Sequence, residues 1–242
     1  MKIESTENFG IDRVKVFVYG PSGSGKTYLA KSIPGSGLII SAEAGLLSLR
    51  GTKIPVIDIT KNDKGDMIPK EKRIERLGEV FSYLNTPEAV KLYDWIFLDS
   101  LTEVAQNLVE MLAIEFPERK EALPMWGEYN KRLRSIIKSF RDIPHYHVVM
   151  TALSSVEKDE NLKSVHFVDI NGKIATQIPQ YFDEVFFCEL SEANGEKKVT
   201  IRTCNTDKST GKDRSGTLLP MESGDMGVIF KKIIAGKGNE NA

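Results

Sequence analysis

The sequence has almost no cysteine, no long hydrophobic run and no excess of charge of either sign. Its two cysteines, Cys188 and Cys204, are too few for a disulfide framework and lack the spacing of a zinc site, so we expect both to be core thiols. The longest apolar runs, such as 95–98, are far shorter than the roughly 20 residues that a membrane helix needs. A formal net charge of −1 over 242 residues excludes a global basic field, so any contact with nucleic acid would need a local basic patch.

The beginning of the chain also lacks an apolar segment. Residues 1–10 are polar and acidic, which is not the pattern of a secretory signal peptide. Few cysteines and no apolar span together predict a soluble protein of the reducing cytoplasm, with no membrane partner.

Apolar periodicity indicates strands that alternate with helices. Buried strands are predicted over 14–19, 37–42, 54–59, 95–98 and 147–151. Helices are predicted over 26–32, 70–84, 101–112 and 125–141. Further along we expect a polar loop over 154–163, a hairpin over 165–174 with a turn at Asn171–Gly172, and strands over 183–190 and 197–203 about a turn at Asn194–Gly195. This order predicts an α/β fold, a mostly parallel sheet with helices on both faces and antiparallel strands near the C-terminus.

A glycine-rich stretch follows the first predicted strand. It matches the pattern G-x-x-x-x-G-K-[ST] and consists of Gly20, Pro21, Ser22, Gly23, Ser24, Gly25, Lys26 and Thr27. Such glycines let backbone N–H groups surround phosphate oxygens, and the following helix adds its dipole. Lys26 would reach the β- and γ-phosphates, and the Thr27 hydroxyl would hold Mg²⁺. The alternative is a glycine-rich turn beside a surface lysine, but a strand and a helix flank the stretch as ATP binding requires.

Two carboxylates end predicted strands. Asp99 follows the apolar strand 95–98, and beside a phosphate loop it is predicted to orient Mg²⁺, the alternative being a helix N-cap. Glu43 ends the strand after the phosphate loop and could orient and deprotonate the water that attacks the γ-phosphate. A surface glutamate that begins a loop is the alternative for Glu43, and the residues alone leave it open.

One predicted helix carries a basic face. Its members recur at i, i+3, i+7 and i+10 and are Lys131, Arg134, Lys138 and Arg141. Such a face can contact the phosphates of nucleic acid. The alternative is the solvated side of a helix that covers the sheet.

The order of these motifs resembles that of the RecA recombinase, in which a phosphate loop precedes a strand ending in the catalytic glutamate. The stretches IFLDSLTEV, MWGEYNKRLRSIIKSFRDI, VVMTAL and RTCNTDKSTGKDRSG resemble the small phage-encoded RecA-like ATPases that promote single-strand annealing. The resemblance implies a RecA-like P-loop NTPase domain over 13–216, preceded by a tail over 1–12 and followed by a C-terminal segment and tail over 217–242. It also implies a location in the host cytoplasm.

The resemblance assigns further roles. It implies that Thr151 senses the γ-phosphate. It implies that the segment 154–163, with Ser154 and Ser155, takes the place of a DNA-contacting loop. It also implies that Lys212 and Arg214 reach the nucleotide of a neighbouring subunit. A solvated turn is the alternative for the last two. The sequence departs from RecA in that the RecA sensor is a glutamine, and the loop here carries more acid than base. The implied partners are single-stranded DNA, further copies of the chain and a single-strand-binding or replication protein.

Three functions stay open from the sequence. The first is a RecA-like ATPase that binds single-stranded DNA and promotes annealing. The second is a loader-like P-loop ATPase that a partner protein activates in DNA replication. The third is a small-molecule kinase, for which the segment 60–76, with Arg73 and Arg76, is the candidate lid. A strand inserted between those of the phosphate loop and Asp99 favours water over an acceptor substrate.

Overall fold

The computed structural model describes residues 12–43, 45–118, 120, 122–158, 162–193 and 196–236. Its strands are β1 (Lys15–Gly20), β2 (Gly37–Ser41), β3 (Val56–Asp58), β4 (Trp95–Asp99), β5 (His147–Lys158), β6 (Ser164–Val168), β7 (Glu184–Ala193), β8 (Glu196–Arg202), β9 (Lys212–Asp213) and β10 (Met221–Ser223). Its α-helices are α1 (Arg73–Leu84), α2 (Pro87–Leu92), α3 (Leu101–Glu115), α4 (Ala122–Arg141), α5 (Ile174–Tyr181) and α6 (Met226–Ala235). Short 3₁₀ helices are η2 (Thr27–Ser32), η3 (Leu46–Leu49) and η4 (Lys70–Lys72).

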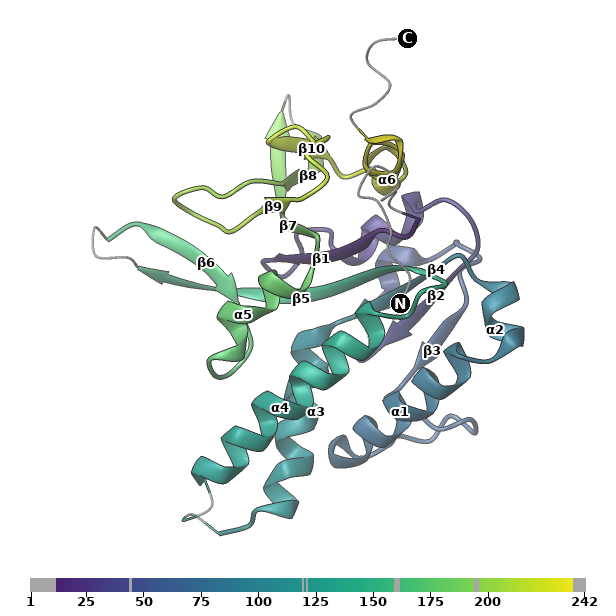
Figure 1. Ribbon diagram of the computed structural model, residues 1–242, viewed down its shortest axis with the longest axis vertical. Coiled ribbons are helices and arrows are strands. Elements are labelled where there is room, and N and C mark those ends of the chain that lie inside the picture. Colours follow the sequence, from purple (N-terminus) through teal and green to yellow (C-terminus); the bar gives the residue numbers. More distant parts are fainter. Residues whose placement is uncertain are drawn as a thin grey trace, which may run out of the picture.

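The strands form one sheet in the order β10-β8-β7-β1-β5-β4-β2-β3, with β6 added to β5 and β9 added to β7 (Figure 1). Strands β7, β1, β5, β4, β2 and β3 are parallel, whereas β8 and β10 continue the sheet in antiparallel pairing. Strand β5 lies between β1 and β4, as the inserted strand was predicted to do. The predicted α/β class, with a mostly parallel sheet, helices on both faces and antiparallel strands near the C-terminus, is confirmed.

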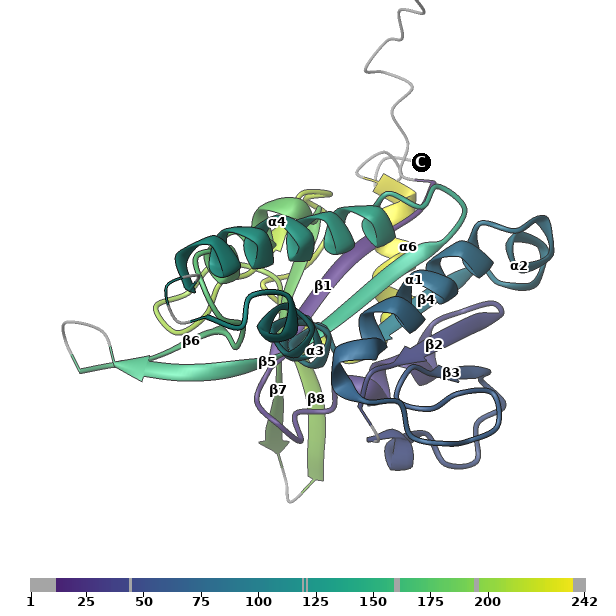
Figure 2. The ribbon, with the colours of Figure 1, turned by 90° about the horizontal axis from the view of Figure 1, so that it is seen from below.

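Both faces of the central strands are buried. Along β1, Phe17 and Tyr19 face the core under α1, α3 and α4, whereas Val16 and Val18 face the core that η2 and α6 complete. This alternation explains why β1 reads as a continuous apolar run, since each face of the strand has its own helical layer. Figure 2 shows the long helices gathered on one side of the strands. None of the helices in the described part of the chain is long and apolar enough to cross a membrane.

The region after Thr151 differs from the prediction. Strand β5 does not end there but continues to Lys158 and pairs antiparallel with β6, so residues 154–158 of the predicted loop are one strand of a β-hairpin. Residues 159–161 lie outside the described residues. The hairpin expected over 165–174 is wrong as well, because Gly172, at φ +83°, leads into helix α5. The predicted turn at Asn194–Gly195 lies outside the described residues.

The C-terminal segment is part of the packed domain. Residues 221–223 pair with β8, and α6 buries Met226, Ile229, Phe230 and Ile233 against the second face of the sheet. The Asp225 carboxylate caps this helix by accepting hydrogen bonds from the N–H groups of Gly227 and Val228. The domain core therefore extends beyond 216, at least to the end of α6.

Candidate nucleotide-binding site

The phosphate loop leaves the sheet at the end of β1 and enters η2. A Cβ on Gly20 would lie 2.1 Å from the carbonyl oxygen of Cys188, so only glycine allows this approach to β7. Gly23 and Gly25 have φ angles of +74° and +94°, which favour glycine as well. The glycines that define the motif are thus explained by backbone geometry.

The Lys26 ammonium group is folded back into the loop. The side chain is 7% exposed, and Nζ donates hydrogen bonds to the carbonyl oxygens of Gly20, at 2.9 Å, and Pro21, at 2.7 Å. Burial lowers the pKa of Lys26, and the nearby acidic groups Asp99 and Glu43 act in the opposite direction. Phosphate oxygens carry full negative charge and are stronger acceptors than carbonyl oxygens, so a bound phosphate can take over these donors.

The Asp99 carboxylate joins two predicted site residues. It is 2% exposed, accepts a hydrogen bond from Thr27 Oγ1 on Oδ2 at 2.6 Å, and accepts another from Thr151 Oγ1 on Oδ1 at 2.5 Å. The N-cap position of α3 is occupied by Ser100, so capping does not explain Asp99. A carboxylate and hydroxyl groups are oxygen ligands of the kind that Mg²⁺ takes, and Thr27 and Asp99 fit its coordination. Bound there, the ion would neutralise charge on the phosphates.

Glu43 lines the same space. A cavity of about 320 Å³ is bounded by Glu43, by Lys26 and Thr27, and by the loop glycines Gly23 and Gly25. Burial raises the pKa of Glu43, the negative charges of Asp99 and Glu103 add to the rise, and Lys26 opposes it. The Glu43 carboxyl group therefore borders the cavity beside the phosphate loop, and its raised pKa makes its ionised form a stronger base.

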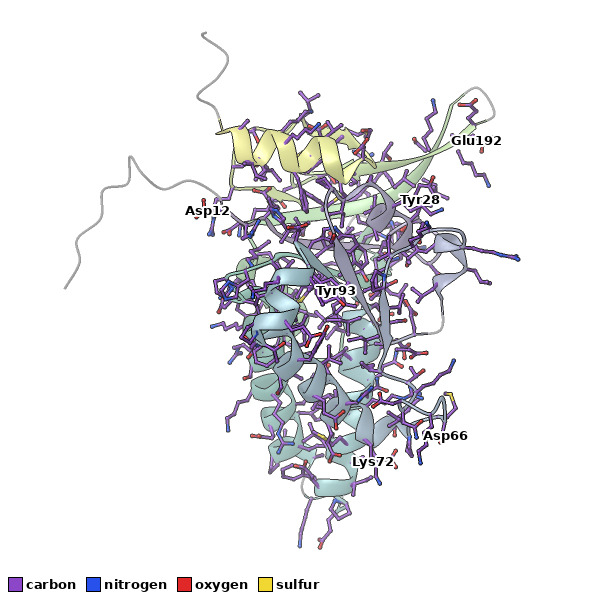
Figure 3. The ribbon with its side chains drawn as sticks, turned by 90° about the vertical axis from the view of Figure 1, so that its right-hand side faces the viewer. Asp12, Tyr28, Asp66, Lys72, Tyr93 and Glu192 are labelled. Atoms are coloured by element: carbon purple, nitrogen blue, oxygen red, sulfur yellow. The ribbon has the colours of Figure 1, made fainter. Side chains whose placement is uncertain are left out.

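A second cavity extends the first. It has a volume of about 690 Å³, shares Gly25, Tyr28 and Ser48 with the phosphate cavity, and continues to Leu190 and Val199 on the β7–β8 hairpin. Figure 3 views this side of the molecule, where Tyr28 lies below the hairpin that carries Glu192. The two cavities give room for a triphosphate and for the nucleoside attached to it. Tyr28, Ser48 and Leu190 were not predicted, and only the position of Tyr28 directly after the motif could have indicated it.

Lys212 and Arg214 lie away from the phosphate loop of their own chain. Lys212 Nζ donates to the carbonyl oxygen of Phe182 at 2.5 Å, and Arg214 forms an ion pair with Asp183 at 2.5 Å. Strand β9, which begins at Lys212, pairs with the start of β7, whereas the loop contacts β7 at Cys188. Lys212 is half-buried in β9, so a solvated turn does not describe it, whereas Arg214 is exposed in a bend, as that alternative expects. Their role toward a neighbouring subunit stays a prediction.

The basic face predicted on α4 is covered in part by α5, and its contact with nucleic acid stays a prediction. Arg134 donates to the Tyr181 hydroxyl at 3.0 Å, Arg141 donates to the Tyr181 carbonyl oxygen at 2.7 Å, and Lys138 lies 5.3 Å from the centre of the Tyr181 ring. Arg134 and Arg141 hold α5 against α4, whereas Lys138 is exposed beside the Tyr181 ring and Lys131 projects with 77% of its side chain exposed. Helical spacing identified a common face but not the element that covers it.

In the candidate kinase lid, the segment 60–76, both arginines bind to groups close to them in the chain. Arg76 forms ion pairs with Asp63 and, at 2.7 Å, with Glu79. Arg73 Nε donates to the carbonyl oxygen of Ile68 at 3.0 Å. Both arginines thus order their own segment, which gives the kinase alternative no support.

Ser154 and Ser155 lie at the base of the β5–β6 hairpin. Both are half-buried, and the Ser154 hydroxyl is 3.3 Å from Nδ1 of His166 on β6. They therefore belong to a regular hairpin, whose contact with nucleic acid stays a prediction.

Comparison with known proteins supports an ATPase. A protein-family model described as AAA domain matches residues 12–215. No curated protein matched the chain. Among solved structures, a KaiC-like protein from the hyperthermophilic archaeon Pyrococcus horikoshii is 16% identical, with 78% of each chain covered and a TM-score of 0.39. An ATPase from the type III secretion system of pathogenic bacteria is 15% identical, with 72% of this chain aligned to 50% of that one and a TM-score of 0.45.

Proposed function

Since the chain belongs to the AAA domain family and is a P-loop ATPase, we propose that it binds single-stranded DNA in a nucleotide-dependent way and promotes the annealing of complementary strands. In this proposal ATP occupies the phosphate cavity and its extension, with Mg²⁺ held by Thr27 and Asp99. Lys26 binds the β- and γ-phosphates, and Glu43 orients and deprotonates the attacking water. The cytoplasmic location and the phage origin stay predictions.

The observation that carries the proposal is the course of strand β5. At Thr151 the strand is hydrogen-bonded to the Asp99 carboxylate, and seven residues later, at Lys158, it is part of the β5–β6 hairpin. This hairpin extends beyond the rest of the sheet (Figure 1). Any change in the Asp99–Thr151 hydrogen bond when nucleotide and Mg²⁺ bind acts on the strand that supports the hairpin. A rigid strand between the two is a physical route for coupling hydrolysis to a ligand on the hairpin.

The charges that line the phosphate cavity are consistent with hydrolysis that requires a second subunit or a partner protein. Among the described residues that line it, Lys26 is the sole cation. Phosphoryl transfer is accelerated strongly by a further cation, which another subunit or a partner protein can supply. Arg214, whose side chain is 63% exposed, is the better candidate for a neighbouring copy, because Lys212 is half-buried against Phe182. The same observation favours, as a second candidate, the loader-like ATPase that a partner protein activates.

The test is binding of fluorescent single-stranded DNA, measured by anisotropy without nucleotide, with ADP and with a non-hydrolysable ATP analogue. We expect the analogue to tighten binding by the wild type and to have no such effect on Thr151→Val, which removes the hydroxyl bonded to Asp99. Thr203→Val is the matched control, because Thr203 is buried and its hydroxyl donates to the Leu219 carbonyl oxygen outside the site. Wild-type affinity that is the same in all three states would contradict the proposal.

A further inference from the structure

A third cavity lies at the base of the hairpin, outside the nucleotide site. Its volume is about 270 Å³. It is lined by residues of β6, by residues of α5 within 175–180, by Tyr19 of β1 and by Thr210. This is slightly below the range of about 300–1,000 Å³ that is usual for small-molecule sites, so it suits one ring system rather than a whole nucleotide.

The lining of this cavity is aromatic and held in place. Tyr19 and His166 both contact the Phe187 ring, with centroid distances of 5.3 Å and 4.7 Å. Phe167 stands at the mouth with 41% of its surface exposed. The Tyr19 and His166 rings are thus held in place, and aromatic side chains beside a space of this size favour a flat ring as the occupant.

The side chains around this cavity favour a flat ring that belongs to a negatively charged polymer. Exposed Lys173 directly precedes α5, and exposed Lys208 is joined to the cavity wall, since its carbonyl oxygen accepts a hydrogen bond from the His166 N–H at 2.7 Å. The exposed amide of Gln180 borders the space and can pair with the polar edge of a base. On the hairpin, Val156 and Leu162 are 55% and 76% exposed, which marks this projecting element as a binding surface (Figure 2).

We propose that this aromatic cavity receives one base of a bound single-stranded nucleic acid, with Phe167 stacked on the base and Lys173 and Lys208 near the adjoining phosphates. The inference rests on the proposed function, because it names where the hairpin would hold its ligand. The cavity is also joined to the phosphate loop. The Tyr19 hydroxyl accepts from the Thr210 N–H at 2.7 Å and donates to the Thr210 carbonyl oxygen at 2.8 Å, and Tyr19 directly precedes Gly20. A molecule in this cavity would therefore contact Tyr19, the residue directly before the phosphate loop.

The test compares an intact oligothymidine with the same oligonucleotide in which successive nucleotides are abasic, so that the phosphates are unchanged. For the wild type we expect tighter binding of the intact strand. Phe167→Ala should weaken binding of the intact strand by about tenfold or more and should leave binding of the abasic strand unchanged. Leu123→Ala, a change of a side chain that is 86% exposed at the start of α4, is the control and should alter neither.

Three results would count against the proposal, and each has a different meaning. Equal binding of the intact strand by Phe167→Ala and the wild type would overturn the base site while leaving the proposed function standing. A change in oligomeric state in Phe167→Ala, without any change in binding of nucleic acid, would assign the cavity to a second copy of the chain and overturn the base site too. No binding of either strand by the wild type would contradict the proposed function itself.

Discussion

At the scale of single residues, the site is organised by one carboxylate. Asp99 holds the hydroxyl groups of Thr27 and Thr151, which come from the phosphate loop and from β5. Thr27 was predicted from the phosphate-loop motif and Asp99 from the end of a buried strand, whereas the role of Thr151 came from the resemblance to RecA-like ATPases. The sequence could not predict that both hydroxyls donate to the same carboxylate, since that depends on the register of strands distant in sequence.

Replacing the two residues that act on the phosphates should separate binding from hydrolysis. Lys26→Ala should abolish binding of a fluorescent ATP analogue, because the loop loses its one cation. Glu43→Gln should keep that binding and lower the rate of hydrolysis by about 100- to 10,000-fold. Glu103→Gln is the control, since Glu103 is near enough to raise the pKa of Glu43 but does not line the phosphate cavity. An unchanged rate in Glu43→Gln would show that another group activates the water.

Glu184 predicts a dependence of stability on pH. It is 1% exposed, its Oε1 accepts a hydrogen bond from the Ser215 N–H at 3.1 Å, and burial raises its pKa to about 8, with Asp213 and Asp183 adding to the rise. Because the folded protein holds this proton more tightly than the unfolded chain, the contribution of Glu184 to stability is present below pH 4.5 and is lost as the pH rises to about 8.

Urea unfolding at pH 5, 6, 7 and 8 measures this effect. The free energy of unfolding of the wild type, relative to that of Glu184→Gln, which stays neutral, should fall across the series. Parallel curves for the two proteins would show that Glu184 is not protonated in the folded state.

At the scale of elements, the parts predicted well are those that the core buries on both sides. Strands such as β1 and β4 are short apolar runs, so their sequence reports their burial directly. Strand β6 reads Ser-Val-His-Phe-Val and is only partly buried; its position was predicted, but its partner was not, because it pairs with β5 and not with residues after Gly172. Helix α5 was missed because it has eight residues and contains Pro179. Helix α5 covers part of the predicted α4 face, which the residue spacing alone cannot show.

Helix α6 gives a prediction at this scale. Phe230 is 1% exposed in the core between the sheet and η2, and Phe230→Ala should lower the free energy of unfolding by about 3–5 kcal/mol. Val228→Ala, on the exposed side of the same helix, should change it little. Chemical denaturation of both variants checks this. A Phe230→Ala variant as stable as the wild type would mean that the C-terminal segment does not support the domain.

At the scale of the whole molecule, strand β5 connects the nucleotide site to the β5–β6 hairpin. The phosphate loop and Asp99 lie at the carboxyl ends of β1 and β4, and β5 runs between these strands and then on into the hairpin. Within the described residues the hairpin, the aromatic cavity at its base and the phosphate cavity are thus connected by β5 and by Tyr19. A ligand on the hairpin and a nucleotide in the site are therefore expected to influence each other.

The rate of ATP hydrolysis with and without single-stranded DNA, at low and at physiological salt, tests this account most directly. Coupling through β5 predicts a strong stimulation by the DNA, and contacts to phosphates predict that it weakens as salt rises. Thr151→Val should hydrolyse ATP with much less stimulation. A rate that is the same with and without DNA at both salt concentrations would contradict the account and would favour an ATPase that a protein partner activates.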